Sequence, residues 1–148
     1  MDEFPAREGY EDLVELRSDP ANDVAWTAVS FPEEGYLWFS LKNPKILRST
    51  ILWFSNLGRD HAPWNGRHGA VVGLEEVTAE FNFGLAESVA TGQTLDMADL
   101  PPVSVLMGVA EIGPDFGRVS MMVPEDGGLR IWDDAGHDTV VACDLSWI

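Results

Sequence analysis

Apolar and polar residues alternate along most of this chain, a period of two that is typical of β-strands with one buried face. Residues 36–41 are a clear case, because Leu37, Phe39 and Leu41 share one face of the predicted strand. Runs of turn-forming residues at 32–35 and 124–128 each separate two such segments and predict hairpins. The predicted strands cover residues 12–17, 24–31, 36–41, 50–55, 70–77, 103–112, 117–123, 129–133 and 139–148.

Two segments depart from this alternation. Residues 50–55 are apolar on both faces, which predicts a strand buried on both sides. Residues 82–91 carry Leu85, Ser88 and Val89 at helical spacing, with Asn82 as a candidate N-cap and Gly92 as a left-handed stop. The pattern therefore predicts an all-β fold, an antiparallel β-sandwich with one short helix. We expect one domain over residues 1–148, in which residues 1–11 form a flexible acidic tail.

Composition narrows the possible partners and the cellular compartment. A net charge of −16 argues against nucleic acid and against anionic membranes, because both select for clustered lysine and arginine. The single cysteine, Cys143, cannot form a disulfide within the chain and fits a reducing compartment. The first residues lack the apolar core of a signal peptide, and no apolar run reaches the roughly 20 residues of a membrane helix. We expect a soluble, cytoplasmic protein.

The charge is unevenly distributed along the chain. In residues 42–68 Asp60 is the one acid, whereas both flanking regions are strongly acidic. Two interpretations stay open: these cations pair with the acidic flanks, or they line a pocket for a polar or anionic ligand. The five cations are Lys42, Lys45, Arg48, Arg59 and Arg67.

The turn-rich segment 56–69 gathers the residue types that recognise sugars. Indole faces stack on the C–H faces of sugar rings, while planar amide and guanidinium groups bind hydroxyls. We predict that a small-molecule sugar is held by four residues of this segment: Arg59, Trp64, Asn65 and Arg67. Most of the other tryptophans, Trp53 among them, are expected in the core or at an interface.

Glu75 is the candidate general base. It ends an apolar strand, where partial burial would suit a carboxylate to proton transfer near neutral pH. Strand alternation places it on the same face as Val71 and Gly73, and its neighbour Glu76 on the other. His61 and His68 are candidate general acids, because imidazole titrates near physiological pH. The alternative is that both histidines are ordinary surface residues and both glutamates lie at a solvated strand end.

Metal and nucleophilic chemistry are less well supported. His61, His68 and Glu75 could together bind a transition metal, as in a small cupin-like barrel, but the chain has no close pair of metal-binding histidines. His137 lies in a predicted turn and is expected to face solvent. No Gly-x-Ser-x-Gly elbow is present, which argues against a serine hydrolase. We therefore predict no metal and no cofactor.

Three motifs in order resemble the C-terminal half of bacterial aldose 1-epimerase-like proteins of the galactose mutarotase superfamily. They are residues 49–75, which include STILWFSNLGRDHAPWNGRHGAVVGLE, residues 83–89, FGLAESV, and residues 107–119, MGVAEIGPDFGRV. The resemblance covers about residues 10–148 and implies part of a large β-sandwich. It also implies sugar-anomer interconversion with Glu75 as the base that takes the anomeric proton.

The resemblance leaves the general acid unassigned. In that family a histidine of the N-terminal half protonates the ring oxygen, so His61 or His68 would have to replace it here. The leading expectation is a mutarotase-like carbohydrate-recognition protein, with aldose 1-epimerase activity as its catalytic form. The alternative is a non-catalytic sugar-binding or assembly domain that forms a homodimer through open sheet edges.

Overall fold

The computed structural model describes residues 4–5, 7–78, 81, 83–92, 94–100 and 102–147. Within them the chain forms two compact units, each built from two separate stretches of sequence. Unit 1 comprises residues 1–20 and 44–101, and unit 2 comprises residues 21–43 and 102–148. The sequence predicts one domain over residues 1–148; the structure groups the chain into two compact units, in each of which segments distant in sequence pair.

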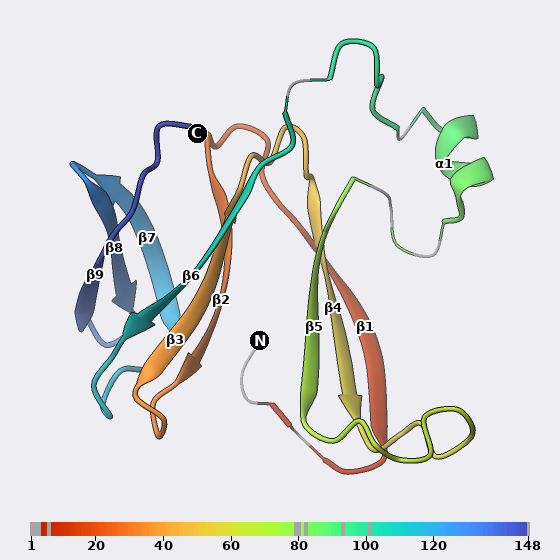
Figure 1. Ribbon diagram of the computed structural model, residues 1–148, viewed down its shortest axis with the longest axis horizontal. Helices are drawn as coiled ribbons and strands as arrows, with labels where there is room; N and C mark the ends of the chain where they lie inside the picture. The colour runs from red at the N-terminus through yellow and green to blue at the C-terminus, as the bar shows by residue number, and fades with distance from the viewer. Residues whose placement is uncertain are drawn as a thin grey trace. The chain divides into compact units, whose positions relative to one another are not determined.

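Unit 1 is a three-stranded antiparallel sheet with a short helix. β4 (Ser49–Asn56) lies between β1 (Tyr10–Arg17) and β5 (Val71–Val77), as Figure 1 shows. Every residue of β4 is buried except Trp53, which is half-buried. The prediction that residues 50–55 are buried on both faces is thus confirmed.

Unit 2 contains two three-stranded antiparallel sheets. The first has the order β2-β3-β6 and the second the order β7-β8-β9 (Figure 1). Both predicted hairpins are present, and a two-residue turn at Asp126 and Gly127 joins the strands of the second. The strands are β2 (Ala25–Phe31), β3 (Tyr36–Lys42), β6 (Val105–Glu111), β7 (Val119–Glu125), β8 (Gly128–Asp133) and β9 (Asp138–Ala142).

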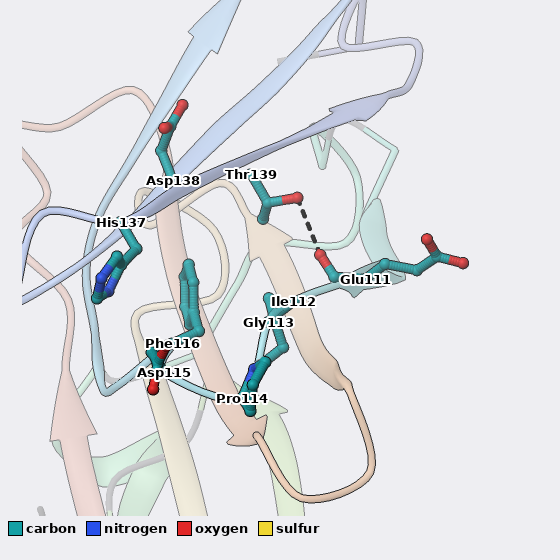
Figure 2. Close-up of a pocket in the computed structure, with 9 residues that line it drawn as sticks. All are labelled: Glu111, Ile112, Gly113, Pro114, Asp115, Phe116, His137, Asp138 and Thr139. Carbon is teal, nitrogen blue, oxygen red and sulfur yellow. Dashed lines mark hydrogen bonds between the residues drawn. The ribbon is translucent and has the colours of Figure 1, made fainter.

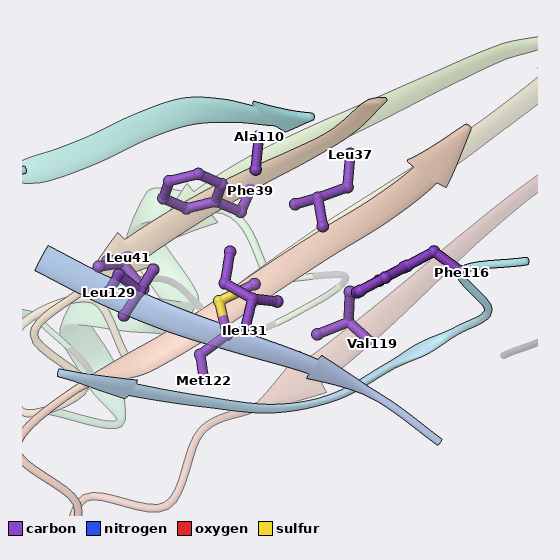
Figure 3. Close-up of a cluster of buried hydrophobic side chains, with 9 residues drawn as sticks. All are labelled: Leu37, Phe39, Leu41, Ala110, Phe116, Val119, Met122, Leu129 and Ile131. Atoms are coloured by element: carbon purple, nitrogen blue, oxygen red, sulfur yellow. The ribbon is translucent and has the colours of Figure 1, made fainter. Parts of the chain in front are cut away.

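The core of unit 2 is filled from both of its sheets (Figure 3). The alternating residues of β3 that the sequence placed on one face, Leu37, Phe39 and Leu41, are all 0% exposed. Gly108 on β6 faces Phe39, where a Cβ would lie 2.5 Å from the Cζ atom of the ring. The all-β prediction is confirmed, with one short helix among the described residues. Unit 2 is the sandwich-like part of the fold, because its two sheets share one hydrophobic core.

The first and the last strand have other boundaries than the sequence predicts. β1 begins at Tyr10, so Tyr10 and Glu11 belong to the sheet and not to a flexible tail. β9 ends at Ala142, because Asp144 accepts a hydrogen bond from the Ser146 N–H and turns the chain. Cys143, Leu145 and Trp147 nevertheless pack against the core of unit 2, as their alternation predicts.

The helix is shorter and less buried than the sequence indicates. α1 (Leu85–Ala90) begins after Gly84, and Asn82, the predicted N-cap, lies outside the described residues. Leu85 is 80% exposed and Val89 60% exposed, so Ser88 is the buried residue of the predicted apolar face. Gly92 has a φ of 70°, which confirms the predicted left-handed stop.

Candidate functional site

The predicted sugar-binding segment forms a closed loop at the end of β4, residues 57–70, called here the 57–70 loop. The Leu57 N–H donates to the carbonyl oxygen of His68 at 2.7 Å, which joins the two ends of the loop. The Ala70 N–H donates to Oδ1 of Asn56 at 3.0 Å. Leu57 and Ala70 both have positive φ angles, of 66° and 52°, where the chain leaves β4 and enters β5.

Backbone hydrogen bonds also cross the interior of this loop. The Gly66 N–H donates to the carbonyl oxygen of Arg59 at 2.8 Å, and the Asn65 N–H donates to that of His61 at 2.9 Å. Asn65 and Gly66 take up left-handed conformations, with φ of 52° and 66°. Asparagine and glycine tolerate this region best, so the sequence Asn65-Gly66 shapes the turn. The loop therefore has a defined path around Arg59.

Arg59 contacts two indole rings. Its Cζ atom is 4.9 Å from the ring centroid of Trp53 on β4 and 4.8 Å from that of Trp64 in the loop. Both distances are within the range of a cation–π interaction, which favours a guanidinium over an indole face. We call these three residues the Arg59 stack.

Glu11 on β1 holds the stack in place. Its Oε2 atom lies 3.2 Å from Nε of Arg59 and accepts a hydrogen bond from Nε1 of Trp53 at 3.1 Å. Its Oε1 atom accepts a hydrogen bond from the buried hydroxyl of Ser55 at 2.6 Å. Burial raises the pKa of Glu11, but the hydrogen bonds from Ser55 and Trp53 and the charge of Arg59 lower it by more. The net result is a pKa below the ordinary value, so Glu11 is an anion near neutral pH.

Both histidines of the loop contact the stack edge-on. The ring of His61 is 5.4 Å from that of Trp64 at 70°, and the ring of His68 is 5.6 Å from that of Trp53 at 73°. His61 is exposed and lies next to Asp60, whose Oδ1 is 3.6 Å from Nδ1 of the imidazole. The Nδ1 atom of His68 is buried and has no hydrogen-bond partner among the described residues.

Glu75 lies on the same face of the sheet as Trp53, because Gly73 pairs with Trp53 and Ile51 pairs with Glu75. A Cβ added to Gly73 would lie 3.3 Å from Cε3 of Trp53 and 3.8 Å from Oε1 of Glu75. The side chains of Trp53 and Glu75 thus both approach Gly73, which has no side chain to separate them. Glu76 points to the other face and accepts a hydrogen bond from Thr50 at 2.7 Å.

The structure corrects one expectation about Glu75. The sequence placed this carboxylate in a partly buried position, but Glu75 is exposed, whereas its neighbour Glu76 is half-buried. Glu76 is half-buried because the buried Thr50 opposite it on β4 donates a hydrogen bond to its carboxylate. An exposed carboxylate is well placed to accept hydrogen bonds from a ligand.

The seven predicted site residues fall into two groups. Arg59, Trp64, His61 and His68 are brought together around the stack, and Glu75 shares the sheet face of Trp53. Asn65 and Arg67 are exposed on the loop, where the Asn65 amide donates to the carbonyl oxygen of Pro63 at 3.5 Å.

Sequence reasoning missed two members of this group. The sequence predicts Trp53 in the core or at an interface, yet its indole is half-buried and contacts Arg59. The sequence predicts Glu11 in a flexible tail, yet it is the anion that pairs with Arg59. One of the two interpretations of the central cations was that they pair with acids of the flanking regions. Arg59 does so, and the residue that it pairs with, Glu11, could not be named from the sequence. Alternation along β1 could have placed Glu11 on one face with Leu13 and Glu15.

Unit 2 has a cavity of about 450 Å³ that the sequence did not indicate (Figure 2). It lies between residues 111–116, which follow β6, and residues 137–139 at the start of β9. Thr139 Oγ1 donates to the carbonyl oxygen of Glu111 at 3.0 Å across this cavity. In Figure 2 the carboxylates of Glu111 and Asp138 point away from it, so its charged rim faces solvent.

His137 at this cavity is tied to the buried Asp133. Its Nδ1 atom lies 2.8 Å from Oδ2 of Asp133, which also accepts from the Gly117 N–H at 2.8 Å. Oδ1 of Asp133 accepts from the N–H groups of Ala135 and His137. Burial raises the pKa of Asp133, but these hydrogen bonds and His137 lower it by more, to well below its ordinary value. Asp133 therefore holds the turn between β8 and β9, and His137 is 52% exposed at its side chain.

Three further observations concern metal binding, membrane helices and similarity to known proteins. The described residues contain no group of three or more histidine, cysteine, aspartate or glutamate side chains placed to hold a metal ion. None of their helices has the length and apolar character needed to cross a membrane. The chain matches no protein-family model, no curated protein and no solved structure.

Proposed function

We propose that the chain is a carbohydrate-binding domain, related to the C-terminal half of mutarotase-like proteins, and that it binds a sugar on the sheet face that carries Glu75. The observation that carries this proposal is the arrangement around Gly73. The indole of Trp53 and the carboxylate of Glu75 both lie close to this glycine, with no side chain between them. Arg59 contacts the same indole from the 57–70 loop.

This arrangement combines the three kinds of contact that sugars use. An indole offers an apolar surface to C–H groups, a carboxylate accepts hydrogen bonds from hydroxyls, and a guanidinium donates them. Trp53, Glu75 and Arg59 supply one of each, and Trp64 adds a second indole beyond Arg59. The hydrogen bonds inside the 57–70 loop fix its path, which lowers the ordering cost of binding.

A substitution at Gly73 tests the proposed position. Gly73→Val would place a side chain between Trp53 and Glu75 in a strand, where a β-branched residue is favoured. We expect sugar binding, followed by ligand-observed NMR with glucose, galactose and their uronic acids, to be lost while the far-UV circular dichroism is retained. Gly113→Ala is the matched control, because open space surrounds that position. Equal binding by the wild-type protein and Gly73→Val would contradict the proposed position.

The catalytic form of the proposal assigns Glu75 as the base for anomer interconversion, with His61 or His68 as the acid. Glu75→Gln then abolishes the acceleration of mutarotation in polarimetry, whereas Glu76→Gln, on the opposite face, retains it. His61→Gln and His68→Gln separate the two candidate acids. A wild-type rate equal to that of buffer alone would contradict catalysis and leave sugar binding as the function.

A second candidate function, assembly through a sheet edge, is favoured by β6. This strand pairs with β3 and with no other strand among the described residues. The side chains of β6 that point away from the core are apolar and exposed: Val105 is 37% exposed, Met107 68% and Val109 59%. The sequence of β6 contains no lysine, arginine or proline, the residues that usually protect an edge from pairing.

A second copy of β6 fits this edge. Two antiparallel copies centred on Gly108 would set Met107 of one opposite Val109 of the other and would keep the two Glu111 carboxylates apart. We expect a dimer in size-exclusion chromatography with light scattering, and a monomer for Val109→Lys. Val140→Lys, at an exposed position of β9, is the control and stays dimeric. A monomeric wild-type protein at high concentration would contradict this candidate.

A further inference from the structure

The outer edge of the Arg59 guanidinium is free to bind a ligand. Its Nε atom pairs with Glu11, and its two terminal nitrogens have no hydrogen-bond partner among the described residues. The Arg59 side chain is 34% exposed, so a ligand can reach it from solvent. Four N–H donors on this edge therefore await acceptors.

The guanidinium is also held in a fixed position. The ring centroids of Trp53 and Trp64 lie 4.9 and 4.8 Å from its Cζ atom, and Glu11 pairs with its Nε atom. Trp53 is itself anchored, because its Nε1 donates to the same carboxylate. A guanidinium ordered before binding presents a rigid fork, which matches the two oxygens of a carboxylate.

We infer that Arg59 binds the carboxylate of an acidic sugar, a uronic acid, while Glu75 contacts the hydroxyls of the same ring. This inference rests on the proposed sugar site. Trp53 joins the two groups, since it contacts Arg59 and packs against Gly73, close to the carboxylate of Glu75. The site thus has a hydrogen-bond donor for an anion, Arg59, and a separate acceptor for hydroxyl protons, Glu75.

A carboxylate fits this position better than a phosphate. A phosphate monoester carries about −1.5 to −2 charges at neutral pH, which a single arginine cannot balance. Arg59 already shares its charge with Glu11, and the chain has a net charge of −16. A carboxylate carries one negative charge, and its two oxygens can accept hydrogen bonds from the two N–H groups of one guanidinium edge.

Titration calorimetry with four sugars tests the inference: glucuronate, galacturonate, glucose and glucose 6-phosphate. We expect a uronate to bind at least about tenfold more tightly than glucose, as for a charge-assisted hydrogen-bonded pair. Arg59→Lys keeps the charge but loses the fork, so it abolishes this preference. Arg118→Lys, at an exposed position of unit 2, keeps it. Tryptophan fluorescence and thermal unfolding check that both variants fold.

The outcomes separate this inference from the proposed function. Equal affinity for uronates and glucose would overturn the inference and leave sugar binding intact. Tighter binding of glucose 6-phosphate than of glucuronate would overturn the assignment of a carboxylate. A uronate preference that survives in folded Arg59→Lys would overturn the role of Arg59. Binding of none of the four sugars would overturn both proposals.

Discussion

Glu11 and Arg59 form an ion pair between the first strand and the 57–70 loop, with Oε2 of the glutamate 3.2 Å from Nε of the arginine. The pair is half-buried and shares its carboxylate with Trp53 and Ser55. A residue near the start of the chain thus fixes the orientation of a side chain at the candidate site. The order of the loop depends on the pairing of β1 with β4.

Replacing Glu11 tests this dependence. Glu11→Ala leaves the hydroxyl of Ser55, which is 0% exposed, and the indole N–H of Trp53 without their acceptor. Losing the partner of a buried polar group costs about 1–3 kcal/mol, and we expect a loss of this size in the free energy of unfolding. Denaturant unfolding measures it, with Glu8→Ala on the exposed part of the same flank as the control. Equal stability of the two variants would show that Glu11 does not hold the site.

The pair of His137 and Asp133 predicts a pH dependence of stability in unit 2. The hydrogen bond to Asp133 and the negative charge of Asp133 raise the pKa of His137 above 6.5. A raised pKa in the folded state means that the stabilisation is complete below pH 6.5 and is lost as the pH rises through the folded value. The pKa of Asp133 is lowered, so its contribution is complete above pH 3.8 and is lost as the pH falls through its folded value.

Thermal unfolding between pH 5 and pH 9 measures the histidine part of this prediction. We expect the wild-type melting temperature to fall as the pH rises through the folded pKa of His137. The His137→Gln variant should lose this part of the pH dependence. An NMR titration of the imidazole reports the pKa directly, and a value below 6.5 would contradict the prediction.

The contact between Gly108 and Phe39 predicts a packing limit in the core. Phe39 is 0% exposed, so its ring has no free space into which it can move away from an added Cβ. We expect Gly108→Ala to lower the free energy of unfolding by about 1–3 kcal/mol, the usual cost of overpacking a core. Gly113→Ala, which adds a Cβ in open space, is expected to have a much smaller effect. A neutral Gly108→Ala would mean that the two sheets can separate locally.

Much of the fold followed from alternation. Leu37, Phe39 and Leu41 had to share a face, and the double-sided apolar pattern of β4 required burial on both sides. The two units could not be predicted in this way, because the pattern along a strand is the same whichever distant strand it pairs with. The pairing of β3 with β6 joins residues such as Leu37 and Ala110, and no local signal encodes it.

The candidate site was predictable in part. Arg59, His61, Trp64 and His68 lie close together in sequence, so a loop rich in glycine and proline was enough to group them. The two missing members, Glu11 and Trp53, come from β1 and β4, and their places depend on the register of that pair. The exposure of Glu75 likewise depends on what lies opposite it across the sheet, and not on the apolar residues that precede it.

The division of each unit into two stretches of sequence affects how the protein is made. During synthesis the β2–β3 hairpin leaves the ribosome long before β6, β7 and β8, which complete its core. Leu37, Phe39 and Leu41 stay uncovered until the chain has extended past Ile131. Such late, long-range closure slows folding and exposes apolar surface to other chains. A nascent chain paused between residues 43 and 105 would accordingly be the form most in need of chaperone binding.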